Sequence, residues 1–221
     1  MDNTQKLIEL FKQFPGIGPR QAKRFVYFLL TRPAGYSKEL AELVAGIKSQ
    51  VRICDMCYRF FQSGVSGNSI CTVCADQRRD ASTLMIVSHD VDFENIEKTK
   101  SFTGYYFILG GTVPILDKNP EARIRQQDLL ETIEKRSKVH PDEVFENFNS
   151  ENLTGSLKEI IIALNYNPEG ENTLMYLQSL LRTLSEKYSL KVSTLGRGLS
   201  TGTELEYSDT DTIKNALKNR Q

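Results

Sequence analysis

The sequence lacks any hydrophobic run that approaches the roughly 20 residues needed to cross a bilayer as a helix. Its first six residues, Met1-Asp2-Asn3-Thr4-Gln5-Lys6, also lack the charged-then-apolar layout of a secretory signal. We therefore expect a soluble, cytoplasmic protein with no membrane partner. The 221 residues, 39% of them hydrophobic, suffice for one good core or for a small module beside a larger domain.

Net charge is also lacking, because 28 Lys and Arg balance 28 Asp and Glu, but the charges are unevenly placed. Residues 1–60 contain ten basic and five acidic residues, a surplus of five positive charges. Residues 61–80 balance, so the remainder has a surplus of five negative charges. The basic first part favours contact with a polyanion, and the acidic remainder favours a different partner, although a solvated face alone can produce such asymmetry.

The four cysteines form two CxxC pairs, Cys54 with Cys57 and Cys71 with Cys74, separated by thirteen residues. This spacing is typical of four thiolates that hold one structural zinc ion, Zn²⁺, in a tetrahedron. Two disulfides are the main alternative, but they are disfavoured without a secretory signal. A catalytic zinc is also disfavoured, because four thiolates leave no open position for water.

Two short helices joined by a tight turn are predicted near the N-terminus. Apolar residues recur at helical spacing across residues 4–14 and again across residues 20–30. The sequence Pro-Gly-Ile-Gly-Pro at 15–19 must break the helix between them. Such an arrangement is typical of a helix-hairpin-helix DNA-binding motif, with a plain helix–turn–helix corner as the alternative.

The residues of this turn suit a contact with a phosphate. Gly16 and Gly18 let the backbone approach an anion without a Cβ in the way. Pro19 starts the next helix, whose free N–H groups favour negative charge, and Ile17 can anchor the turn in the core.

Three basic residues, Arg20, Lys23 and Arg24, share one face of the second helix at i, i+3 and i+4. We expect them to contact the DNA backbone in a salt-sensitive way that is largely blind to sequence. A third helix, predicted over 37–49, leads directly to the first cysteine. The hairpin and the zinc motif are therefore expected to form one compact module.

Strands alternate with helices after residue 80. Buried strands are predicted at 84–87, 105–109, 159–164 and 190–194, and helices at 94–100, 121–138, 172–187 and 209–218. The alternation implies a parallel sheet covered by helices. In such sheets functional groups gather past the carboxyl ends of the strands, here at residues 88–92, 110–111, 165–171 and 196–198. Residues 140–156 are polar and are predicted to be an insertion or a mobile loop.

The segment from Asn165 to Glu171 places two carboxylates, Glu169 and Glu171, at one of these strand ends. Carboxylate and amide oxygens can ligate Mg²⁺. Acidic residues in the first turn of a helix are also common without a metal, because they stabilise the helix dipole. The residues alone leave both interpretations open.

The order of these motifs resembles the RecR family of bacterial recombination mediators over nearly the whole chain. The matching pieces are the hairpin at 14–24, the paired CxxC motif, Arg79-Asp80, Leu109-Gly-Gly, Glu169-Gly-Glu-Asn-Thr, Arg197-Gly-Leu and Glu204-Leu-Glu-Tyr. The resemblance implies a multi-domain α/β protein. Its expected parts are a helix-hairpin-helix module at 1–52, a four-cysteine zinc finger at 53–79, a Toprim domain at 80–195 and a C-terminal segment at 196–221.

The resemblance also implies a function in recombinational DNA repair without catalysis. Members of the family form ring-like homo-oligomers, dimers or tetramers, that can encircle DNA. They act with RecO, and often with RecF, to load the RecA recombinase onto single-stranded or gapped DNA. The hairpin region carries the DNA contact, and the acidic Toprim face, which matches Asp92, Asn165, Glu169 and Glu171 here, contributes to partner binding.

The chain departs from the family at Ser88, where the first Toprim strand usually ends in a glutamate. Asp92 matches the following family aspartate, and Asp90 could partly substitute for the missing carboxylate. The departure puts Mg²⁺ binding and the RecO contact at this site in doubt. It also disfavours the alternative function, a Toprim nuclease or primase, because such enzymes need a carboxylate-held Mg²⁺.

Overall fold

The computed structural model describes residues 2–62, 69–138, 157–196, 210 and 212. The chain divides into two compact units, Met1–Arg52 and Ile53–Gln221. The predicted insertion at 140–156 and the C-terminal motifs at 197–199 and 204–207 lie outside the described residues, and so does the helix predicted over 209–218 except for residues 210 and 212.

The first unit is helical. It contains α1 (Asn3–Phe11), α2 (Pro19–Leu30) and α3 (Ala34–Gln50). Each helix was predicted from the spacing of its apolar residues. The buried core of this unit consists of three side chains, Ile8, Ala22 and Val26, with Phe11 and Ile17 packed against them.

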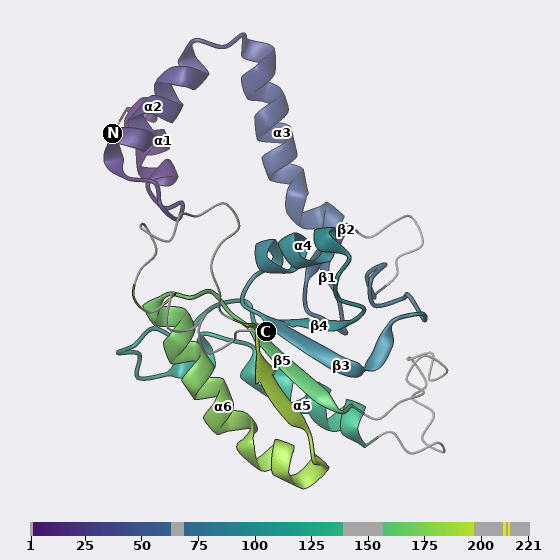
Figure 1. The fold of residues 1–221 in the computed structure, drawn as a ribbon. Helices are drawn as coiled ribbons and strands as arrows, with labels where there is room; N and C mark the ends of the chain where they lie inside the picture. The colour runs from purple at the N-terminus through teal and green to yellow at the C-terminus, as the bar shows by residue number, and fades with distance from the viewer. Residues whose placement is uncertain (1, 63–68, 139–156, 197–209, 211, 213–221) are drawn as a thin grey trace. The chain divides into compact units, whose positions relative to one another are not determined.

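The second unit is built on a four-stranded parallel sheet in the order β4-β3-β5-β6 (Figure 1). The strands are β3 (Asp80–Val87), β4 (Gly104–Ile108), β5 (Glu159–Ala163) and β6 (Lys191–Thr194). Ile86 of the central strand β3 lies opposite Phe107 on one side and Ile162 on the other. The predicted parallel sheet is therefore confirmed.

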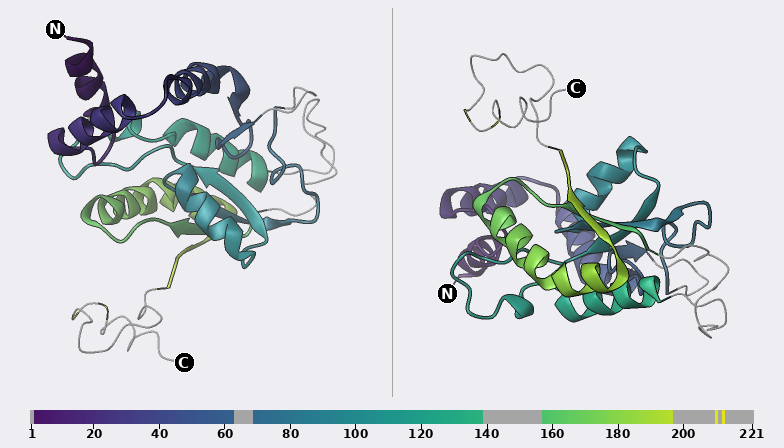
Figure 2. Two further views of the ribbon diagram at one scale, coloured as in Figure 1. Left: turned by 90° about the horizontal axis from the view of Figure 1, so that it is seen from above. Right: turned by 60° about the horizontal axis from the view of Figure 1, so that its bottom comes forward.

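Two helices, α5 (Gln126–Ser137) and α6 (Pro168–Tyr188), cover one face of this sheet (Figure 2). Leu129 of α5 and Leu177 of α6 are fully buried against Leu84, Ile86 and other side chains of that face. Burial of these side chains stabilises the unit through the hydrophobic effect.

The opposite face is covered by α4 (Asp90–Thr99) and by the two cysteine loops. All four cysteines belong to one buried cluster with sheet residues that include Met85, Val87, Tyr106 and Ile108. Beside the first loop, β1 (Val51–Ile53) pairs with β2 (Phe60–Gln62). The expectation that the hairpin and the cysteines form one compact module is wrong, because the cysteines pack into the core of the second unit.

The helix predicted over 121–138 is also corrected. The structure has a 3-10 turn at Pro120–Ala122 and starts α5 only at Gln126. Between them, the backbone N–H of Arg125 donates to the carbonyl of Leu109 at 2.9 Å, and Ile124 is buried in the core. These two contacts hold the chain outside helical geometry despite its helical sequence pattern.

No helix among the residues that the structure describes is both long and apolar enough to cross a membrane.

Candidate metal centre and binding surfaces

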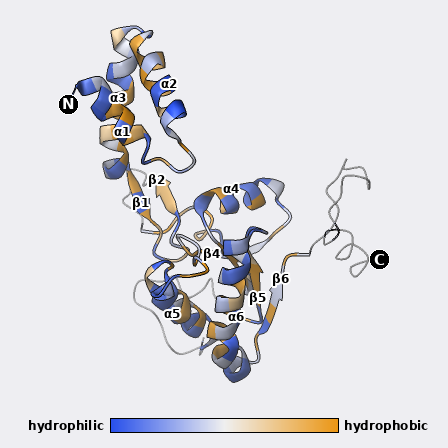
Figure 3. Cartoon of the chain, turned by 90° about the vertical axis from the view of Figure 1, so that its left-hand side faces the viewer, coloured by the Kyte–Doolittle hydropathy of each residue, from blue (hydrophilic) through white to orange (hydrophobic). Residues whose placement is uncertain are grey.

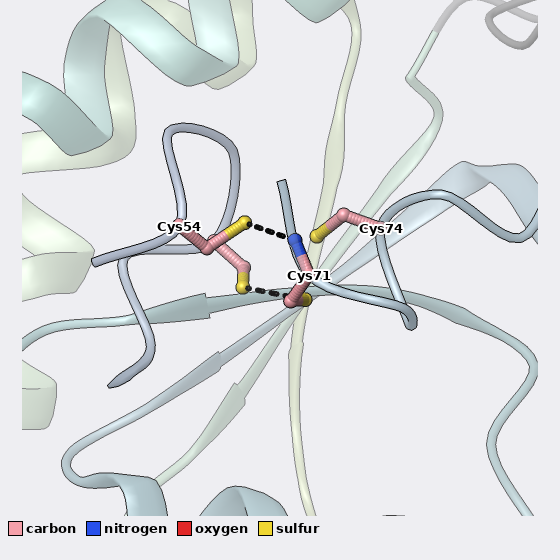
Figure 4. Close-up of side chains that lie close together, drawn as sticks. Cys54, Cys71 and Cys74 are labelled. Carbon is pink, nitrogen blue, oxygen red and sulfur yellow. Dashed lines mark hydrogen bonds between the residues drawn. The ribbon is translucent and has the colours of Figure 1, made fainter. Parts of the chain in front are cut away.

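The four cysteine sulfurs converge on one point (Figure 4). Their Sγ atoms all lie within 4.8 Å of one another, and those of Cys57 and Cys71 are 3.7 Å apart. A tetrahedral zinc with Zn–S bonds of about 2.3 Å requires sulfurs roughly 3.8 Å apart. Each cysteine is at most 3% exposed, so the residues present fit a closed, four-coordinate structural ion.

The four thiols influence one another's ionisation. Hydrogen bonding with Cys57 lowers the pKa of the Cys54 thiol, whereas hydrogen bonding with Cys54 raises the pKa of Cys74. A divalent cation at the centre allows all four sulfurs to ionise, because it replaces the shared protons.

Backbone hydrogen bonds attach the first cysteine loop to the sheet and to α4. Ile108 at the end of β4 donates its N–H to the carbonyl of Cys57 at 2.9 Å. The N–H of Phe60 donates to Oδ1 of Asp90 at 2.7 Å, and the Arg59 guanidinium lies over the ring of Phe93. Asp90, considered from sequence as a substitute metal ligand, is therefore engaged in holding this loop.

The second loop joins the first through a sulfur and a carbonyl. The N–H of Cys71 donates to Sγ of Cys54 at 3.3 Å, and the N–H of Asp55 donates to the carbonyl of Ser69 at 3.1 Å. An N–H···S bond of this kind stabilises a thiolate.

The hairpin turn of the first unit has the backbone that the glycines suggested. Gly16 has φ of +75°, which favours glycine. A Cβ on Gly18 would meet no atom of the chain within 4 Å, so internal packing does not require glycine there. Ile17 is half-buried against the small core, as its predicted anchoring function requires.

The N-terminus of α2 is open. Gly18 provides no side-chain cap, and Pro19 stands at the first helical position. Arg20, Lys23 and Arg24 are all exposed on this helix. The turn therefore combines uncapped helical N–H groups with three exposed cations, an arrangement that suits a phosphate.

At the carboxyl edge of the sheet, the structure brings Asp92 and Asn165 together. The amide of Asn165 donates to Oδ1 of Asp92 at 3.4 Å, and the N–H of His89 donates to its Oδ2 at 3.0 Å. Asp92 thus caps α4. Ser88 is completely buried, and its hydroxyl has no hydrogen-bond partner in the described part of the chain.

The two glutamates lie in the first turn of α6, which Asn167 caps by accepting from the N–H of Gly170 at 2.8 Å. Glu169 accepts from the hydroxyl of Thr112 at 3.1 Å. Within the described residues, the cysteines form a group of three or more metal-ligating side chains, and these carboxylates do not. Asp92 and Glu169 are instead engaged in hydrogen bonds with neighbouring segments.

Sequence reasoning missed the loop that follows β4. Thr173 of α6 accepts from the N–H of Val113 at 2.8 Å, and Asn172 donates to the Val113 carbonyl at 2.9 Å. These side chains hold residues 112–114 against α6. The Asn-Thr pair that follows Glu-Gly-Glu was visible in the sequence, but its partner lies about 60 residues away along the chain.

Comparison with known proteins identifies three family models along the chain. A Toprim domain matches residues 82–195, a RecR helix-hairpin-helix matches residues 4–46, and a RecR C-terminal segment matches residues 198–221. A recombination protein RecR from Bifidobacterium longum subsp. infantis is 37% identical over 218 residues, which cover 98% of this chain and 94% of the relative. The RecR of Acidothermus cellulolyticus is 32% identical over 217 residues, which cover 98% and 95% of the two chains.

Removing the Asp90 carboxylate should loosen the first cysteine loop. In Asp90→Ala the Phe60 N–H loses its acceptor, so we expect its amide hydrogen exchange to accelerate about tenfold, the effect of roughly 1–2 kcal/mol. Asp90→Asn retains an acceptor oxygen and should exchange like the wild type. Equal protection of Phe60 in the wild type and Asp90→Ala would contradict this attachment.

The purified protein should contain one zinc ion per chain by elemental analysis, and Cys71→Ser should lose it. Thr72→Ser, a change inside the same loop at a residue that is not a ligand, should retain it. Lowering the pH should release the metal, because protons compete for the thiolates. Removal by a chelator should lower the urea midpoint, since the sheet face under the cysteines loses its cover. A metal-free protein with the same midpoint would refute a structural ion.

Proposed function

Because the chain belongs to the RecR family of recombination proteins, we propose that it is a non-catalytic DNA-binding mediator in recombinational DNA repair. In this proposal it assembles into a ring-like homo-oligomer. It acts with RecO, and with RecF where present, to load RecA onto single-stranded or gapped DNA. The observation that carries the proposal is the open, basic hairpin turn of the first unit.

DNA binding is assigned to Gly16, Ile17, Gly18, Arg20, Lys23 and Arg24. The two glycines keep the turn free of side chains, and the half-buried Ile17 holds it in place. A DNA phosphate can then accept hydrogen bonds from the first free N–H groups of α2. The side chains of Arg20, Lys23 and Arg24 neutralise the adjacent phosphates of the same backbone. Such a contact recognises the backbone and not the base sequence, as a loading factor that works at any gap requires.

Self-association is supported by the exposed apolar side chains of the first unit, whose helices carry hydrophobic segments in Figure 3. No side chain of α3 is buried. Its Leu43, Val44 and Ile47 are each more than half exposed, and Leu40 lies on the same stripe. A helix with an uncovered apolar stripe is stabilised by a partner helix. A core of three buried residues also leaves this unit little stability of its own.

Protein partners are assigned to the carboxyl edge of the sheet, with Asp92, Asn165, Glu169 and Glu171. Hydrogen bonds fix Asp92 and Glu169 in place, so their charges are held at defined positions. Fixed charges of one sign steer a partner of the opposite sign and select its orientation. The assignment therefore gives this edge a function in recognition.

Catalysis is not part of the proposal. A Toprim enzyme uses a carboxylate-held Mg²⁺. Here the buried Ser88 occupies the position where the first carboxylate of such a site is expected. Asp90 accepts a hydrogen bond from the N–H of Phe60 and so holds the first cysteine loop. The cysteines are assigned to a structural Zn²⁺.

We keep the four parts expected from the sequence as functional divisions. These are 1–52 for DNA contact, 53–79 for zinc, 80–195 for the Toprim domain and 196–221 for the C-terminal segment.

Substituting the three hairpin cations should weaken DNA binding and its salt dependence. In Arg20/Lys23/Arg24→Ala we expect the slope of log K against log salt to fall by roughly 2–3, because about three phosphate contacts are lost. The measurement is a salt-titrated binding assay on gapped DNA. The control, Lys6/Lys38/Lys48→Ala, removes the same charge from exposed positions of the same unit outside the α2 face. If both triple variants lose the same affinity and slope, general charge explains binding and the hairpin assignment fails.

Placing a charge on the α3 stripe should break the oligomer. Val44→Glu buries a carboxylate in the proposed helix–helix contact, so we expect a smaller solution mass by light scattering. Ala45→Glu adds the same charge on the opposite side of α3 and should leave the mass unchanged. A wild type that is a monomer at all concentrations and with DNA would contradict the ring itself.

A further inference from the structure

The loop between β4 and the 3-10 turn exposes two aliphatic side chains to an unusual degree. Ile115 is 60% exposed and Leu116 is 91% exposed. An isolated exposed leucine needs no explanation on a mobile surface. This loop, however, is held firmly by hydrogen bonds on both sides of Ile115 and Leu116.

One side of the loop is fastened to the start of α6. The Thr112 hydroxyl donates to Glu169, the N–H of Val113 donates to Oγ1 of Thr173, and Asn172 donates to the carbonyls of Val113 and Pro114, at distances of 2.8–3.3 Å. Thr173 is itself completely buried. The residues immediately before Ile115 are therefore fixed by polar contacts.

The other side is closed by Asp117. Its N–H donates to the Pro114 carbonyl at 3.1 Å, which forms a turn with Ile115 and Leu116 at its centre. Its carboxylate accepts from the N–H of Asn119 and from Arg123, and these bonds lower the pKa of the carboxyl group. The carboxylate of Asp117 thus stays ionised and holds the turn across the neutral pH range.

A rigid loop that exposes apolar side chains is suited to docking. The loss of conformational freedom on binding is small, because the loop is ordered before it meets a partner. Hot spots in protein interfaces are such anchored side chains inserted in a pocket. Met175, one helical turn after Asn172 and 63% exposed, extends the apolar surface beside the loop.

The charges around this surface indicate what kind of partner fits. Three acidic residues, Asp117, Glu169 and Glu171, accompany one basic residue, Lys118, in the loop (residues 109–119) and the first turn of α6. The surplus is two negative charges. A two-fold contact between copies would place these carboxylates opposite one another, which is unfavourable. A partner with a basic rim is favoured instead.

We propose that Ile115 and Leu116 form a preorganised anchor that inserts into an apolar pocket, rimmed by basic side chains, on the protein partner of the loading reaction. The inference rests on the proposed function, which supplies the partner. It adds a defined contact to the acidic edge, and it assigns Thr112, Asn172 and Thr173 as the positioning residues that hold the anchor.

The test uses the full-length chain and purified RecO of the same bacterium, with affinity measured by fluorescence anisotropy. Leu116→Glu should weaken RecO binding about tenfold or more. Leu116→Ala, which adds no charge, should weaken binding in the same direction. Leu116→Met keeps the apolar volume and should bind within about twofold of the wild type. Leu195→Glu places the same charge at another exposed leucine, 49% exposed, and should bind like the wild type.

DNA affinity on gapped DNA and solution mass are measured for the same variants, and both should stay unchanged. Wild-type affinity in Leu116→Glu and Leu116→Ala would overturn the anchor and leave the proposed function standing. A smaller mass for Leu116→Glu would overturn it in favour of a contact with a second copy. If Leu116→Glu and Leu195→Glu lose the same affinity for RecO, the loss is a general effect of added charge and the anchor is wrong. If the wild type binds gapped DNA but does not bind RecO, both the proposed interaction with RecO and the proposed anchor are wrong.

Discussion

The convergence of four cysteine sulfurs is the constraint on which the second unit depends. One face of its sheet is covered by two helices, whereas the other, among the residues that the structure describes, is covered by α4 and two loops with little regular structure. Such loops cannot bury enough apolar surface to offset the entropy of ordering them. A cation held by Cys54, Cys57, Cys71 and Cys74 would supply the missing free energy. The cysteines themselves belong to the buried layer, where they pack with Tyr106 and its neighbours.

The sequence predicts the regular elements well where local pattern and tertiary packing agree. The helices of the first unit and the four parallel strands follow from periodicity and from the alternation of strand and helix. Prediction fails at residues 121–138, where the pattern is helical throughout. The break there results from the bond between Arg125 and Leu109 and from the burial of Ile124. Both contacts depend on the chain at and after β4, which is distant in sequence, so the local sequence pattern of residues 121–138 cannot predict them.

The same limit applies to the functional surfaces. The functional residues of the cysteine motif and of the hairpin are close together in the sequence, so both motifs could be predicted from it. Asp90 could not, because its partner Phe60 lies 30 residues away and sequence alone presents it as one more carboxylate near a strand end. The anchor at Ile115 and Leu116 was likewise hidden. Its rigidity comes from side chains of α6, which the sequence places in a separate element.

These contacts also explain how the carboxyl edge of the sheet keeps its architecture. In a metal site, carboxylates are held apart by repulsion until a cation joins them. Here Asp92 is engaged by a backbone N–H and by Asn165, and Glu169 by Thr112. Each bond ties one segment of the chain to another. The oxygens of these side chains therefore help to maintain the fold. An edge built in this way suits the basic protein surface that we propose as its partner, and these contacts do not involve Ser88.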